Sequence, residues 1–68
     1  MKLIYKSSDD RIKVYRLEVN PSPCWLVEAP NEDTLCPTLD EAYREALQYL
    51  TTSRDILELK KALDKERI

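Results

Sequence analysis

Residues 38–50 carry the signals of a capped amphipathic helix, and this feature constrains the fold most. Thr38 is a good N-cap residue, and Glu41 three positions later completes a T-x-x-E capping box. Pro37 stands just before the cap, where it ends any strand and prevents the helix from extending backwards. The pattern predicts a helix from about residue 39 to about residue 51. Its apolar face consists of Leu39, Ala42, Tyr43, Ala46, Leu47 and Leu50.

The segment before this helix predicts a strand, a polar turn and a second, shorter strand. Residues 24–29 are rich in aromatic and branched apolar residues, which favour extended structure. The run P-N-E-D at residues 30–33 has turn chemistry without glycine. Residues 34–36 could then return as a short edge strand, which would be the fourth strand of the sheet. The uncharged face of the longer strand is expected in the core, and it consists of Trp25, Val27 and Ala29.

The first twenty residues predict two further strands, at about 2–6 and 11–20, joined by a polar turn. We expect Leu3 and Tyr5 to share one face of the first strand. The second strand has apolar residues on both faces: Ile12 and Val14 on one, and Tyr15, Leu17 and Val19 on the other. Two explanations stay open. Either a bulge near Val14 switches the buried face, or both faces are partly covered.

A second helix is expected from about residue 53 to about residue 66. Ile56, Leu59 and Leu63 form a narrow apolar stripe along it. If the helix folds back, the stripe joins the core. If it projects, the stripe needs a partner helix or a second copy, so a homodimer through this helix is one expectation. A third possibility is that residues 51–53 simply continue the first helix.

These segments predict a small α+β domain spanning residues 1–68. Its antiparallel sheet of three or four strands is packed by the first helix, and the second helix follows. A chain of this length buries only about 60% of its unfolded surface, so a partner or a second copy would stabilise it. No stretch has the length and apolarity of a membrane helix or of a signal peptide. We therefore expect a cytoplasmic protein whose two cysteines are free thiols.

The residue types argue against catalysis. The chain has no histidine, which removes the usual base and metal ligand near neutral pH. Two cysteines with eleven residues between them do not form a zinc pattern, and the carboxylate pairs fall in turns. No serine has a visible activating base. We expect no catalytic residue, no metal site and no cofactor, and hence no enzyme.

The charges divide the chain into three parts. Residues 1–17 have a net charge of +3, residues 18–45 of −6 and residues 46–68 of +1. Such polarity steers a partner more than it shapes a fold. We therefore expect a non-catalytic protein-binding module, a regulator or inhibitor of another protein. Its candidate contact residues are the acidic Glu32, Asp33, Asp40, Glu41 and Glu45, with Ile56, Leu59 and Leu63 of the apolar stripe.

The alternative is a module that binds RNA or single-stranded nucleic acid. Aromatic residues on successive strands, flanked by basic side chains, can stack bases. The low isoelectric point, about 5.0, disfavours this alternative, because nucleic-acid binders are usually basic. Its candidate residues are Lys2, Lys6, Arg11, Lys13, Arg16, Tyr5 and Tyr15.

About a third of the chain resembles a recurrent strand-pair-plus-helix module. The matching residues are Trp25, Val27, Pro30, Thr38, Glu41, Ala42 and Ala46. In this pattern the chain is similar to the antitoxin half of HicA/HicB-type toxin–antitoxin pairs. It departs from that family in having no glycine-containing loop and no appended DNA-binding domain. The resemblance implies binding and inhibition of another protein.

Overall fold

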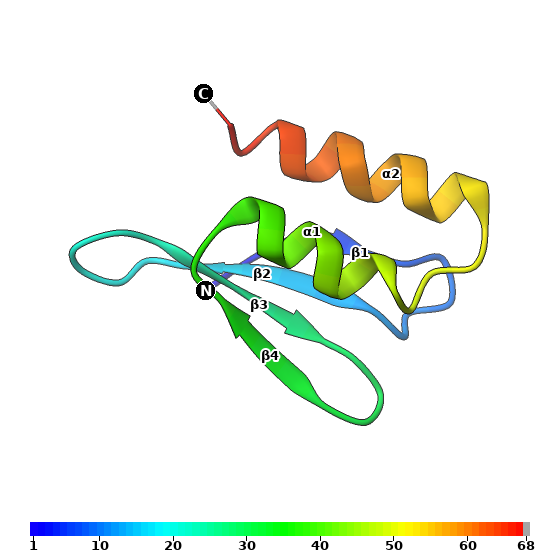
Figure 1. The fold of residues 1–68 in the computed structure, drawn as a ribbon, viewed down its shortest axis with the longest axis horizontal. Coiled ribbons are helices and arrows are strands. Elements are labelled where there is room, and N and C mark those ends of the chain that lie inside the picture. Colours follow the sequence, from blue (N-terminus) through cyan, green and yellow to red (C-terminus); the bar gives the residue numbers. More distant parts are fainter. Residues whose placement is uncertain (68) are drawn as a thin grey trace.

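A computed structural model describes residues 1–67 as a four-stranded antiparallel sheet followed by two helices, which confirms the α+β class (Figure 1). The strands are β1 (Lys2–Lys6), β2 (Lys13–Leu17), β3 (Cys24–Glu28) and β4 (Asp33–Cys36). The helices are α1 (Leu39–Leu47) and α2 (Ser53–Asp64). Neither helix is long and apolar enough to cross a membrane.

The strands follow one another across the sheet in the order β1-β2-β3-β4. Both helices lie on the same face of this sheet, so the fold has two layers (Figure 1). Helix α1 packs on β2, β3 and β4, while α2 packs on β1 and against α1. Neither of the two helices in residues 1–67 lies on the opposite face of the sheet.

A bulge in β1 determines which side chains of that strand reach the core. The pairing with β2 shifts between Leu3, which lies opposite Tyr15, and Tyr5, which lies opposite Val14. Because Tyr15 and Val14 are adjacent in β2, they point to opposite faces, and so do Leu3 and Tyr5. The expectation that Leu3 and Tyr5 share a face is therefore wrong. The irregularity lies in β1, not in β2 near Val14.

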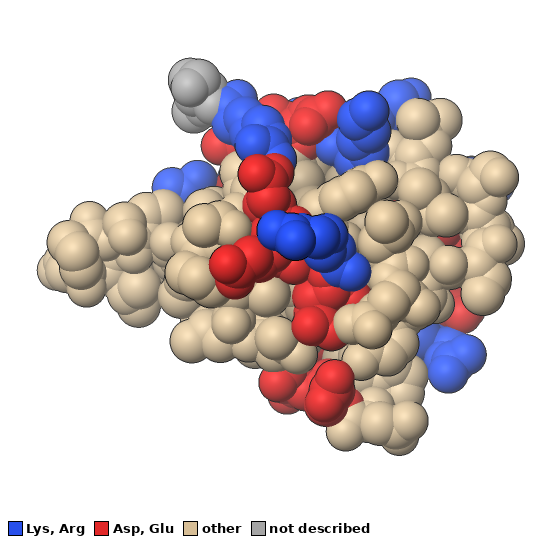
Figure 2. Space-filling model, in the orientation of Figure 1, with Lys and Arg blue, Asp and Glu red and all other residues tan. Residues whose placement is uncertain are grey.

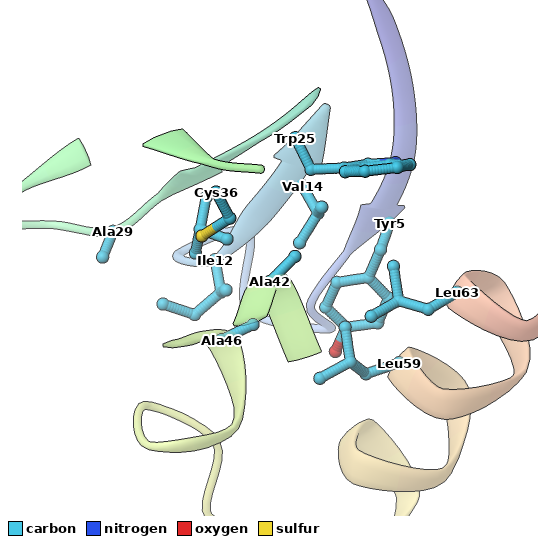
Figure 3. Packing of buried hydrophobic residues seen from close by; sticks show 11 residues of the cluster. Tyr5, Ile12, Val14, Trp25, Ala29, Cys36, Ala42, Ala46, Leu59 and Leu63 are labelled. Atoms are coloured by element: carbon cyan, nitrogen blue, oxygen red, sulfur yellow. The ribbon is translucent and has the colours of Figure 1, made fainter. Parts of the chain in front are cut away.

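The core lies between the sheet and the two helices (Figure 3). Tyr5 from β1 lies against Leu59 and Leu63 from α2, and its hydroxyl donates a 3.2 Å hydrogen bond to the carbonyl of Asp55. Burying these apolar groups supplies the main stabilisation of the fold. The buried apolar residues are Tyr5, Ile12, Val14, Trp25, Val27, Ala29, Cys36, Ala42, Ala46, Leu59 and Leu63.

Helix α1 begins as predicted and ends earlier than predicted. The Thr38 hydroxyl accepts a hydrogen bond from the backbone N–H of Glu41 at 3.2 Å, as the capping box requires. The helix ends at Leu47 instead of residue 51. The N–H groups of Tyr49 and Leu50 each donate to a carbonyl three residues back, which tightens the last turn and ends the helix.

Helix α2 folds back onto the sheet, which decides among the three possibilities left open by the sequence. Thr52 caps it by accepting a 3.3 Å hydrogen bond from the N–H of Asp55. It is therefore a separate helix, not a continuation of α1. At its far end Arg67 pairs with Asp40 of α1, which ties the two helices together.

Candidate functional site

The sheet face without helices is the strongest candidate surface, and the strand register defines it. Residues paired across neighbouring strands point to the same side, so three rows of side chains cross this face. We call these ten residues the open face. The central row is Leu3, Tyr15, Leu26 and Leu35. One end row is Lys6, Lys13, Glu28 and Asp33, and the other is Leu17 and Cys24.

Six of the ten side chains on the open face are apolar or aromatic. Leu3 is 46% exposed and Leu35 60% exposed, at the two edges of the central row. Tyr15 and Leu26 between them are half-buried, although no helix covers them. Single exposed apolar residues are common on protein surfaces, whereas a contiguous apolar row is a candidate contact surface.

The charged end row of the open face is divided by sign. Lys6 and Lys13 stand on β1 and β2, whereas Glu28 and Asp33 stand on β3 and β4. The Nζ atom of Lys13 lies 3.9 Å from a carboxylate oxygen of Glu28 across the middle of the sheet. The row is therefore basic at one edge of the sheet and acidic at the other.

The acidic residues expected to bind a partner do not form one site. Figure 2 shows acidic side chains gathered over α1 and toward β4. Asp33, however, belongs to the open face. Glu41 and Glu45 line a shallow groove of about 450 Å³ between α1 and β4, together with Leu35.

Three of these acidic side chains already have partners inside the molecule. The hydrogen bond from Arg67 holds the pKa of Asp40 below its usual value. The hydroxyl of Tyr49 donates to a carboxylate oxygen of Glu32 at 3.0 Å. The side-chain amide of Gln48 donates to Glu45. The acidity of this side is thus partly neutralised, which weakens it as a specific contact surface.

The apolar stripe of α2 is used within the molecule. Leu59 and Leu63 are fully buried against the sheet, and Ile56 is half-buried. Leu59 and Leu63 are therefore covered within the molecule, and Ile56 is the more accessible residue of the stripe, while a homodimer through this helix stays a prediction. The physical reason is that α2 folds back and packs on β1, which leaves its apolar side covered.

The basic and aromatic residues considered for nucleic acid are split between the two faces. Tyr5 is buried beneath α2, and Arg16 forms ion pairs with Glu18 at 2.7 Å and with Glu66 at 3.1 Å. The pairing places Lys2 in the same row as Arg16, on the helix side of the sheet. Arg11 lies in the turn before β2. Only Tyr15, Lys6 and Lys13 share the open face.

The buried polar groups hold the fold together. Asp55 is almost fully buried, and its carboxylate accepts hydrogen bonds from the N–H of Ser8 at 3.3 Å and from its hydroxyl at 3.1 Å. These bonds tie the turn after β1 to the first turn of α2. Burial raises the pKa of the Tyr5 hydroxyl to about 12, and Asp55 adds to this shift.

Cys36 is also buried, and its pKa is raised, first by burial and then by the carboxylates of Glu45 and Glu41. A nucleophilic cysteine has a lowered pKa instead. Cys24 and Cys36 are both free, and they point to opposite faces of the sheet. Within residues 1–67, no three or more histidine, cysteine or acidic side chains lie together as metal ligands would.

Most residues of the open face, including Leu3, Leu26 and Leu35, were not among the contact residues predicted from the sequence. One signal was available, because apolar residues alternate on both faces of the second and third strands. Only one of those faces can contact the helices in a two-layer fold. The other face then necessarily presents apolar side chains to its surroundings.

Comparison with known proteins identifies no relative. No protein-family model, no curated protein and no solved structure matches this chain. The similarity to HicB-type antitoxins thus stays a resemblance of seven residues, and the function has to be inferred from the surfaces of the molecule.

Proposed function

We propose that this chain is a non-catalytic protein-binding module that regulates or inhibits a partner protein. The observation that carries the proposal is the open face, with its row of apolar side chains from one sheet edge to the other. Contiguous apolar surfaces of this kind are typical of protein–protein contacts. The resemblance to antitoxins supports the inhibitory form of this role, and the free thiols fit a cytoplasmic setting.

The energetics of the open face favour a protein partner. Burying apolar surface contributes about 25 cal/mol for each Å² removed from water. Leu3 and Leu35 still expose roughly half of their surface, so a partner that covers the central row gains on the order of 1 kcal/mol from each. The charged row beside them then sets orientation more than affinity.

The state of the buried titratable groups supports a non-catalytic role. Tyr5 and Cys36 both have raised pKa values, so both keep their protons near neutral pH. The Asp55 carboxylate is engaged by Ser8 in holding the fold. These groups stabilise the fold, and none of them is activated as a nucleophile or as a base.

The test is affinity capture from the native host with two matched variants. Leu35→Lys places a charge on the open face, and Leu57→Lys places one on α2, at a side chain that is 54% exposed. We expect the captured protein to be lost with Leu35→Lys and retained with Leu57→Lys. Equal capture by both variants would show that the partner does not use the open face and would overturn this basis for the proposal.

Nucleic-acid binding is the second candidate, and one observation favours it. Tyr15 and Lys13 both lie on the open face in β2, and Lys6 on β1 is paired with Lys13. Glu28 and Asp33 on the same face repel phosphates, which is why we rank this candidate lower. Titration of mixed oligonucleotides over a range of salt concentrations tests it. Tight binding that weakens steeply with salt and needs Tyr15 would replace the protein-binding proposal.

A further inference from the structure

We infer that the open face binds a second copy of this chain, so that two sheets stack face to face in a two-fold symmetric dimer. The inference rests on the proposed function of this face as a protein-contact surface: the second copy occupies the face when no other partner protein is bound, and the two compete for it. Symmetric dimers use the same patch on both copies, so the patch must be complementary to itself. The open face meets this requirement in both its charges and its apolar rows.

The charged row determines the direction of the two-fold axis. An axis parallel to the strands, between β2 and β3, places β1 of one copy over β4 of the other and keeps each row over itself. Lys6 then faces Asp33 of the second copy, and Lys13 faces Glu28 of the second copy. Each of these pairs occurs twice, so the dimer gains four contacts between opposite charges.

The other in-plane axis, perpendicular to the strands, does not give this match. It would place the charged row of one copy over Leu17 and Cys24 of the other. The charged row would then lose water against apolar groups and gain no opposite charge from the second copy, beyond the pairs of Lys13 with Glu28 and of Lys6 with Asp10 that each copy already has, which is unfavourable. The arrangement of the four charges therefore selects the axis parallel to the strands.

The apolar rows are complementary about the same axis. Leu3 at the β1 edge lies over Leu35 of the second copy, and Tyr15 lies over Leu26 of the second copy. In the remaining row, Leu17 lies over Cys24 of the second copy. Aligned stacking of two sheets about 10 Å apart is a common way to form such a core. Both helical layers stay outside, so the acidic surface over α1 remains accessible twice in the dimer.

The size of the face predicts a weak dimer. Four strands about 4.8 Å apart and five residues at about 3.3 Å each give a face of roughly 19 by 17 Å. This footprint is below that of a standard protein interface, which buries about 800 Å² on each partner. We therefore expect a reversible dimer with a dissociation constant in the micromolar range.

Sedimentation and light scattering from about 1 μM to about 1 mM protein test the dimer directly. The wild type and Leu57→Lys are expected to shift from monomer to dimer over this range, while Leu35→Lys stays a monomer. A wild-type protein that is monomeric at the highest concentration overturns the inference. So does a dimer that forms equally well with Leu35→Lys.

A charge exchange identifies the geometry. Lys6 and Asp33 lie on the outer strands of one sheet, about 14 Å apart across three strand spacings, so they cannot pair within a copy. Lys6→Glu and Asp33→Lys should each raise the dissociation constant about tenfold, because each places like charges opposite each other. The double variant should recover dimerisation to within about threefold of the wild type. Failure of the double variant to recover contradicts the proposed axis.

Mixing the two single variants gives the sharpest readout. In a mixed dimer both contacts join opposite charges, so Lys6→Glu and Asp33→Lys should prefer each other over themselves, as native mass spectrometry can measure. No preference for the mixed dimer overturns the inference. A monomeric wild type that still captures another protein through Leu35 refutes the dimer alone. A dimer that captures no other protein instead refutes the regulatory role alone.

Discussion

The two faces of the sheet are both apolar, yet only one of them is covered. Val14 and Val27 point toward the helices and are fully buried, whereas Tyr15 and Leu26, their neighbours in the same strands, point the other way and are half-buried. Residues 1–67 form two short helices, and both pack on one face of the sheet. The comparison shows that the helices of residues 1–67 cover one apolar face and leave the other uncovered.

The largest expected effect is on the free energy of unfolding. The prediction compares truncation of one leucine on the covered face with truncation of one on the open face. Leu59→Ala removes a fully buried side chain and should lower the free energy of unfolding by about 3 kcal/mol. Leu35→Ala should change it by less than about 0.5 kcal/mol, because the side chain is mostly exposed. Urea unfolding at low protein concentration measures both. Similar losses for the two variants would mean that the open face contributes to folding as much as the covered face does.

The second prediction concerns the stability of the protein at alkaline pH, which we expect to depend on Tyr5 of the covered face. The folded protein holds the Tyr5 proton up to about pH 12, mainly because of burial, while the unfolded chain releases it near pH 10. The stabilisation is therefore complete below pH 10 and is lost as the pH rises through 12. A shift of two pKa units corresponds to about 2–3 kcal/mol.

Tyr5→Phe is the control for this titration. It removes the ionisable hydroxyl together with its hydrogen bond to the carbonyl of Asp55. The variant should be less stable at neutral pH and should lose less stability between pH 9 and pH 11.5, as urea unfolding at several pH values can measure. An unchanged alkaline slope would show that other groups cause the loss.

The third prediction compares two aspartates, one on each side. Asp55→Asn weakens the hydrogen bonds that the carboxylate accepts from Ser8 and should lower the free energy of unfolding by about 1–2 kcal/mol. Asp33→Asn on the open face should leave the monomer's stability unchanged within about 0.5 kcal/mol. Hydrogen exchange at the Ser8 amide should accelerate only in Asp55→Asn. Faster exchange in both variants would mean that the effect is not local.

The elements of this fold could be predicted from the sequence because their signals are local. The capping box at Thr38 and the apolar spacing of α1 need only neighbouring residues. The bulge between Leu3 and Tyr5 could not be predicted, because it depends on how β1 pairs with β2. In the turn between these strands Asp10 has a positive φ of 64°, which the sequence does not predict.

The candidate site was less predictable, because a surface depends on topology. The charge pattern predicted Asp40 and Glu45 as contact residues, but in the fold both accept hydrogen bonds from side chains of the same molecule. The stripe of α2 was correctly identified as apolar, yet it became core once the helix folded back. The open face became visible only when the register aligned Leu3, Tyr15, Leu26 and Leu35 in one row.

The last prediction has the smallest expected effect. It compares the labelling rates of one cysteine on each face of the sheet and involves no change in the stability of the fold. Cys24 lies on the open face and Cys36 on the covered face, and both are free thiols. A maleimide should label Cys24 readily. It should label Cys36 about a hundredfold more slowly, because burial shields that thiol and raises its pKa.

In the proposed dimer, Leu17 of the second copy covers Cys24, so labelling of Cys24 should slow about fivefold or more at high protein concentration. Leu35→Lys should abolish this dependence, whereas Cys36 should be insensitive to concentration in both proteins. Peptide mass spectrometry after quenching resolves the two sites, and a Cys24 rate that does not vary with concentration would place the second copy, if there is one, elsewhere.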